Sequence, residues 1–254
     1  MSDNFARNSV VAGNLYFRLG VDAVVAHAPA RLEHQPAAAR EYFAELIPKL
    51  DGNLIVYNMP LTTNVSLPIE VCKATARKPR VIGIKDSENN ASRLGELLRE
   101  LGGQDSFSVF VGTGPLMATG LLQGADGIVP SVGNLVPALC RQFYDSVTHG
   151  DAGRTELLHG QLMEFSNIYQ KGRSLGQSLA ALKGAMSLLG LCGPDVFPPL
   201  GLTTPEERLK LRDELIRLGV PIRDANLDEQ QTNHRPDDGR PRGYWTRTLP
   251  ADSH

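Results

Sequence analysis

Apolar runs of strand length recur along the first half of the chain, and each is followed by a stretch with helical spacing. The runs end at Pro29, Tyr57, Lys85, Gly112 and Ser131. One strand-plus-helix unit takes roughly 20–30 residues, so these ends mark successive units of one architecture. Because the runs do not alternate with polar residues, they predict strands buried on both faces, as in a parallel sheet covered by helices.

The pattern changes after residue 135. Helical stretches then follow one another without strands, over 136–150, 151–170, 175–191 and 204–219. The last one opens with Thr204 and Glu207, which form the sequence signature of a capping box. The sequence therefore predicts a strand–helix domain over 1–135 and a helical subdomain over 136–221. Residues 222–254, which carry Tyr244 and Trp245, are polar and aperiodic and predict a disordered tail.

The composition excludes several classes of protein. The chain has 254 residues, 41% of them hydrophobic, and a formal net charge of -2, which predicts no nucleic-acid or membrane partner. No apolar run approaches the roughly 18 residues of a membrane span, and the N-terminus lacks the apolar core of a secretory signal. Three scattered cysteines favour a reducing cytoplasm, and the scattered histidines predict no metal site.

Lys85 closes a buried apolar run at the carboxyl end of its predicted strand, where parallel sheets place their active sites. A lysine amine attacks a ketone only when it is unprotonated, and its pKa in water is about 10.4. Burial at the mouth of a strand lowers that pKa, which would make Lys85 a Schiff-base nucleophile. The alternative is that Lys85 simply reaches water at the strand tip.

Tyr57 ends the preceding run, on a neighbouring strand that would lie roughly 4.8 Å away. A Schiff-base enzyme needs a group that moves protons, and a phenol at the same height could serve. The alternative for Tyr57 is packing at the rim of the sheet. Asp86 could pair with a cation or cap the following helix, and the cap is the favoured interpretation.

The segments "YNMP" (57–60), "GIKDS" (83–87), "GTG" (112–114) and "GADGIVPSVGN" (124–134) resemble the dihydrodipicolinate synthase / N-acetylneuraminate lyase family. The resemblance covers roughly residues 9–220. It implies a class I, pyruvate-dependent aldolase on a TIM (β/α)8 barrel, assembled as a homotetramer or dimer and acting without a cofactor.

The resemblance also implies roles for individual residues. Lys85 would form the imine with a 2-oxo acid, and Tyr57 would shuttle protons. The substrate pocket would be lined by Thr62, Thr63, Gly112, Thr113 and Val129.

Two departures narrow these implications. Dihydrodipicolinate synthases carry a carboxylate-binding arginine after the YN-P motif, where this chain has Thr62, which cannot form a bidentate ion pair. A lyase that cleaves a 2-keto-3-deoxy sugar acid to pyruvate and an aldehyde therefore fits better, with a sugar-acid dehydratase as the alternative.

The family's first three strands have no counterpart, so we expect a partial barrel from an N-terminally truncated chain. A remnant that no longer catalyses is the other interpretation. A nucleotide-binding domain is disfavoured, because Met117 replaces the third glycine of the GxGxxG pattern.

Overall fold

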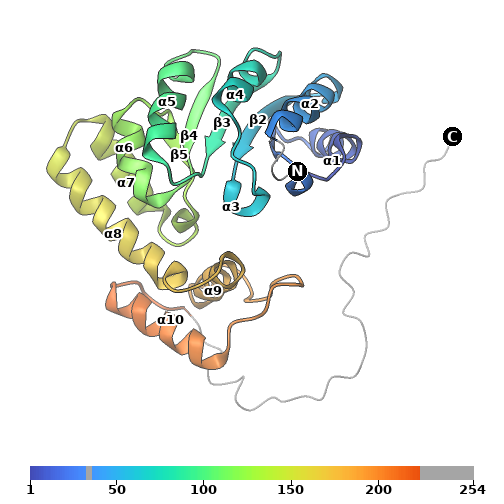
Figure 1. Ribbon diagram of the computed structural model, residues 1–254. Coiled ribbons are helices and arrows are strands. Elements are labelled where there is room, and N and C mark those ends of the chain that lie inside the picture. Colours follow the sequence, from blue (N-terminus) through green and yellow to red (C-terminus); the bar gives the residue numbers. More distant parts are fainter. Residues whose placement is uncertain (33–35, 224–254) are drawn as a thin grey trace, which may run out of the picture.

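The computed structural model describes residues 1–32 and 36–223 (Figure 1). Its centre is a parallel five-stranded sheet in which the strands follow one another in chain order. The strands are β1 (Ala23–His27), β2 (Asn53–Asn58), β3 (Val81–Asp86), β4 (Ser108–Val111) and β5 (Gly127–Ile128). This arrangement confirms the α/β class and the parallel sheet that the apolar runs predict.

Helices precede and connect the strands. They are α1 (Ala6–Arg18), α2 (Pro36–Leu46), α3 (Pro60–Thr63), α4 (Ile69–Ala76), α5 (Ala91–Leu101) and α6 (Met117–Leu122). Short 3-10 turns lie at η1 (Ala30–Leu32), η2 (Ile47–Lys49), η3 (Gly114–Leu116) and η4 (Ser131–Asn134). The outer helices α1, α2, α4, α5 and α6 lie along one side of the sheet (Figure 1). Leu54, Ile84, Val109 and Leu97 are buried between the two layers.

Four longer helices form the second half of the described chain, as the sequence predicts. They are α7 (Pro137–Thr148), α8 (Ala152–Gln170), α9 (Leu175–Leu188) and α10 (Pro205–Arg217). The capping box of α10 is present, since Thr204 and Glu207 each receive the other's backbone N–H. In Figure 1, α9 and α10 lie beyond the carboxyl ends of the strands.

Among the described residues, no helix combines the length and the apolar composition that a membrane span requires. The predicted tail falls, from residue 224 onward, outside the described residues, and so do Tyr244 and Trp245.

The register of the sheet brings the polar strand ends to one level. Tyr57 pairs with Lys85, and Asn58 pairs with Asp86. The ladder continues past β3, because the Ser87 N–H donates to the Asn58 carbonyl at 2.9 Å. At the start of the ladder between β3 and β4, a Cβ on Gly83 would lie 2.6 Å from the Ser108 carbonyl oxygen. The close approach of β3 and β4 therefore requires a glycine at this position.

We predict that Gly83→Ala lowers the free energy of unfolding by roughly 1–3 kcal/mol, because the contact it creates is with backbone that cannot rotate away. Urea unfolding monitored by circular dichroism measures this loss. Gly95→Ala, within α5, is the matched control, since its Cβ would meet only the Gln123 side chain at 3.5 Å. Helix propensity should make that variant more stable by up to about 1 kcal/mol. Equal stability of the two variants would contradict the prediction.

Candidate active site

Lys85 and Tyr57 lie side by side at the carboxyl ends of β3 and β2. The Lys85 Nζ is 4.5 Å from the centroid of the Tyr57 ring, and both side chains are half-buried. The Ser87 hydroxyl donates to the Tyr57 Oη at 3.3 Å. The parallel register places the amine, the phenol and the serine hydroxyl within reach of one small molecule.

A cavity of about 630 Å³ opens at these strand ends and extends to the junction of α8 and α9. Of the predicted site residues, it brings together Lys85, Tyr57, Gly112, Thr113 and Val129. This volume falls within the range of small-molecule sites, which is roughly 300–1,000 Å³. The cavity therefore joins the candidate amine to a space large enough for a substrate.

Gly112 makes room for the amine. A Cβ at this position would collide with the Ser87 Oγ and would lie 2.7 Å from the Lys85 Cε. The first glycine of the "GTG" segment thus allows the Lys85 side chain to extend along the cavity floor.

Thr62 and Thr63 do not line this cavity. Each hydroxyl donates to the Met59 carbonyl at 3.1 Å, and Thr63 is buried. The two threonines thereby hold the turn that follows β2. Met59 and Leu61 face the cavity from this segment instead, so the wall after β2 is apolar.

A buried polar network lies beneath the strand ends. The Asp86 carboxylate accepts from the Arg93 Nε at 3.1 Å, the Asn58 Nδ2 at 2.9 Å and the Glu88 N–H at 2.9 Å. Asn58 is also buried, and its Oδ1 accepts from the Leu67 N–H at 3.0 Å. The network ties β2, β3 and α5 together directly below the candidate site.

The favoured interpretation of Asp86 as a helix cap is wrong. The N-cap of α5 is Asn90, whose side chain accepts from the Arg93 backbone N–H at 3.0 Å. Asp86 instead forms an ion pair with the Arg93 side chain, which reaches back from the first turn of α5.

Burial controls the titration of this network. It raises the pKa of Asp86 above its ordinary value, while Arg93 and the hydrogen bonds from Glu88 and Asn58 oppose the rise. Burial also raises the pKa of the neighbouring Cys72 thiol to about 11, against the opposing charge of Arg93. Cys72 is therefore a protonated core residue.

The opposite wall of the cavity comes from η4 and the end of α8. The Ser131 Oγ and the Tyr169 Oη are 2.6 Å apart, and the Gln170 Nε2 donates to each of them at 3.2 Å. Burial raises the pKa of Tyr169, so it is a neutral phenol. Arg173 lines the same wall, and its Nη1 donates to the Ile168 carbonyl at 3.0 Å. The sequence places Ser131 at the end of an apolar run, but its patterns give no signal for Tyr169, Gln170 or Arg173.

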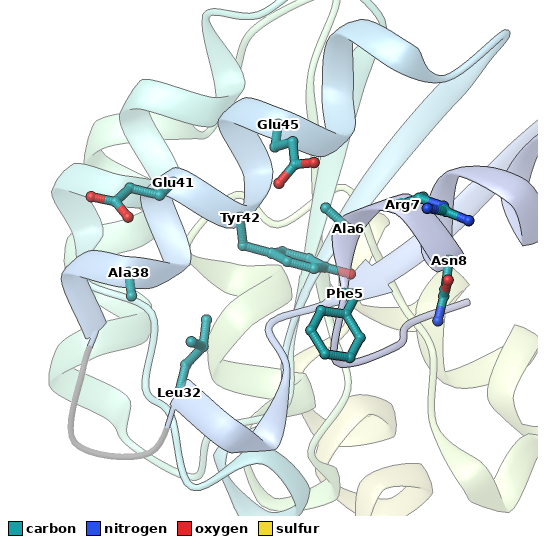
Figure 2. Close-up of a pocket in the computed structure, with 9 residues that line it drawn as sticks. All are labelled: Phe5, Ala6, Arg7, Asn8, Leu32, Ala38, Glu41, Tyr42 and Glu45. Carbon is teal, nitrogen blue, oxygen red and sulfur yellow. The ribbon is translucent and has the colours of Figure 1, made fainter.

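A second cavity, of about 610 Å³, lies between α1 and α2 (Figure 2). Tyr42 projects into it, and its Oη is 2.7 Å from the Ser9 Oγ. Glu41, Glu45 and Arg7 stand at its edges, but no predicted site residue lines it. The strand-end cavity, which contains Lys85, is therefore the candidate active site.

Metal-ligating side chains are not grouped in this part of the chain. Within residues 1–32 and 36–223, no three histidine, cysteine, aspartate or glutamate side chains gather in an arrangement that could hold a metal ion.

Comparisons with known proteins agree on one family. The model of the dihydrodipicolinate synthetase family matches residues 3–217. An uncharacterised DapA-like lyase of Thermofilum pendens is 26% identical over 228 residues, which are 87% of this chain and 74% of that protein. A 4-hydroxy-tetrahydrodipicolinate synthase of Methanosarcina mazei is 26% identical over 201 residues, covering 79% of this chain and 67% of that protein.

Solved structures give the same result. The dihydrodipicolinate synthase of Bacteroides thetaiotaomicron superposes with a TM-score of 0.79 and 31% identity, over 85% of this chain and 72% of that chain. YagE, a prophage protein of E. coli solved in complex with pyruvate, superposes with a TM-score of 0.77 and 23% identity over 86% and 73%. At 23% identity, the similarity to YagE shows a shared fold and nothing more.

We predict that Arg93→Met lowers the free energy of unfolding by roughly 3–5 kcal/mol, because it leaves the buried Asp86 carboxylate without its cation. The loss should shrink as the pH falls from about 8 to about 5. Without Arg93, the pKa of Asp86 rises further, so the folded state binds a proton that the unfolded state does not. Chemical denaturation at several pH values measures both effects.

Arg99→Met is the matched control for this prediction. Arg99 is 68% exposed and pairs with Glu100 at 3.6 Å, so its loss should cost less than about 1 kcal/mol at any of these pH values. An Arg93→Met variant as stable as the control would show that the buried pair does not support the strand ends.

Proposed function

The chain belongs to the dihydrodipicolinate synthetase family, as its motifs predict, and we propose that it is a Schiff-base lyase that acts on a 2-oxo acid. One observation carries the proposal. The Lys85 amine lies 4.5 Å from the Tyr57 ring in a cavity of about 630 Å³ at the strand ends. Curated relatives named as lyases and synthases, such as the T. pendens and M. mazei proteins, support the reaction type.

The proposed reaction begins when the unprotonated form of the Lys85 amine attacks the C2 carbonyl of the 2-oxo acid. The carbinolamine loses water, and the protonated imine that results withdraws electrons from C3. The C3–C4 bond breaks as the C4 hydroxyl gives up its proton, which leaves an aldehyde and an enamine. Protonation of the enamine at C3 and hydrolysis then release pyruvate and restore Lys85.

Tyr57 is proposed to carry the protons in these steps. Its phenol stands beside the amine, and the Ser87 hydroxyl donates to its oxygen at 3.3 Å. That hydrogen bond orients the phenol, which would protonate the departing carbinolamine hydroxyl. The phenolate formed in that step can then accept the C4 hydroxyl proton. The same oxygen can return the proton to C3 of the enamine.

For the substrate, we propose a 2-keto-3-deoxy sugar acid. The synthase names of several relatives favour dihydrodipicolinate synthesis instead, but the position after "YNMP" does not support it. Thr62 lies outside the cavity and donates into its own turn, while Met59 and Leu61 face the cavity there. No carboxylate-binding group therefore stands on this wall among the described residues.

A dehydratase of a related sugar acid would use the same imine to expel water. Mass spectrometry of the products separates the two reactions. Cleavage yields pyruvate and an aldehyde, whereas dehydration keeps every carbon atom in one product and lowers its mass by one water.

Tyr57→Phe removes one hydroxyl and keeps the ring packing. If Tyr57 carries protons, we expect turnover to fall roughly 10²–10⁴-fold with an unchanged free energy of unfolding. Steady-state kinetics and urea unfolding measure the two quantities. Tyr144→Phe is the matched control, because that phenol donates to the Asp126 carbonyl and lies outside the cavity. A Tyr57→Phe turnover within twofold of the parent would leave Tyr57 a packing residue.

Treatment with pyruvate and borohydride should attach a three-carbon acid to Lys85 through reduction of the imine. Peptide mapping by mass spectrometry locates the adduct. Lys183, which is also half-buried but lines a different cavity, is the internal control for reactivity due to burial alone. Lys85→Arg should abolish the adduct, because a guanidinium is not nucleophilic at neutral pH. An adduct spread evenly over surface lysines would refute the Schiff-base proposal.

A further inference from the structure

The strand-end cavity carries positive charge without a balancing carboxylate. Lys85 and Arg173 are among its lining residues, and no aspartate or glutamate of the described chain is. Arg173 also forms no ion pair within the part of the chain that the structure describes. A concave site lined by one sign of charge attracts ligands of the opposite sign, so the cavity favours an anionic substrate.

Lys85 and Arg173 stand on different walls. Lys85 extends from the end of β3, whereas Arg173 lies in the connection between α8 and α9. In Figure 1 this connection lies across from the carboxyl ends of the strands. The wall between them that follows β2 is apolar, with Met59 and Leu61. A substrate bound to Lys85 through its keto carbon would therefore meet Arg173 with a more distant group.

Arg173 is held in place but retains most of its hydrogen-bonding capacity. Its Nη1 donates to the Ile168 carbonyl at 3.0 Å, which fixes the half-buried guanidinium against the last turn of α8. A guanidinium has five N–H donors in a planar fork, and this bond uses one of them. The fork matches the geometry of a carboxylate, to which arginine commonly makes two parallel hydrogen bonds.

We propose that Arg173 binds a second carboxylate of the substrate, at the end remote from the keto carbon. The substrate class would then be a 2-oxo acid with two carboxylates, such as a 2-keto-3-deoxy aldaric acid. This inference rests on the proposed function in one respect, which is that Lys85 takes the keto carbon. The hydroxyl pair of Ser131 and Tyr169 lies on the same wall and adds polar groups beside the carboxylate.

A purely structural role for Arg173 would not explain its place in the cavity. Carbonyl groups in the last turn of a helix need donors, and Arg173 supplies one to Ile168. That role needs a single N–H group and no charge. It does not account for an arginine that lines the same cavity as Lys85 and has no carboxylate partner among the described residues.

Two probes of equal chain length test the inference by isothermal titration calorimetry. 2-Oxoadipate has a second carboxylate at its far end, and 2-oxohexanoate has a methyl group there. We expect the parent protein to bind 2-oxoadipate more tightly. Arg173→Gln should weaken the binding of 2-oxoadipate roughly 10- to 100-fold, because a hydrogen-bonded charge pair is lost. The affinity for 2-oxohexanoate should stay within about twofold of the parent's.

Arg77→Gln is the matched control, because it removes the same charge from an exposed position outside the cavity. It should preserve the preference for 2-oxoadipate, and thermal unfolding should show both variants folded. Three results would overturn the inference. The first is an equal loss of affinity for both probes in Arg173→Gln, and the second is no loss of affinity for either probe. The third is a parent protein that binds the two probes equally well.

Borohydride trapping with the same probes separates this inference from the proposed function. Selective loss of 2-oxoadipate binding together with an adduct at Lys85 supports both. The same selective loss without an adduct at Lys85 supports the carboxylate site and refutes the Schiff-base chemistry.

Discussion

The buried ion pair between Asp86 and Arg93 is the interaction on which the candidate site depends. Two charges inside a protein lose several kcal/mol of hydration each, so a pair of this kind persists only with good geometry and further hydrogen bonds. Asn58 and the Glu88 N–H supply those bonds. Because Asn58 belongs to β2, Asp86 to β3 and Arg93 to α5, the pair fixes two strand ends relative to each other and to the next helix. Lys85 and Tyr57 each precede a member of this network by one residue, so their side chains emerge beside hydrogen-bonded strand ends.

The cavity above this network has two walls with different physical origins. The strand wall carries Tyr57, Lys85 and Gly112, whose positions follow from the hydrogen-bonded register and from a glycine where a Cβ would collide. The helix wall carries Tyr169, Gln170 and Arg173, whose positions follow from the packing of α8 and α9 across the strand ends. A connection between helices tolerates substitution more readily than the strands of a sheet do. The two proposals therefore assign the bond-making chemistry to the strand wall and the selection of the substrate to the helix wall.

Much of the strand wall could be predicted from the sequence, and little of the helix wall. Apolar runs that end in polar residues indicate where parallel strands end. Because the connections are short, consecutive strands are expected to lie next to each other in the sheet. The four C-terminal helices were equally predictable from their periodicity. Arg173 carries no such signal, because an arginine between two helices resembles any solvated connection. Apolar periodicity gives no signal for α1, because this helix buries the small residues Ala6, Ser9 and Gly13 and exposes Val11 and Leu15.

Asp86 and the two threonines show a further reason why local patterns mislead. A carboxylate just before a helix is usually a cap, but here Asn90 occupies that position and Asp86 is turned into the core toward Arg93. Thr62 and Thr63 follow the "YNMP" segment, yet each hydroxyl already donates to the Met59 carbonyl, 3.1 Å away in the same turn. In both cases the deciding partner lies within seven residues, and the choice among partners is set by which side chain the fold buries. With the threonines engaged in their own turn, the wall after β2 offers a substrate only apolar contacts from Met59 and Leu61. Any anionic group on the distal half of a substrate must then be met from the helices, where Arg173 is the cation that the described part of the cavity provides.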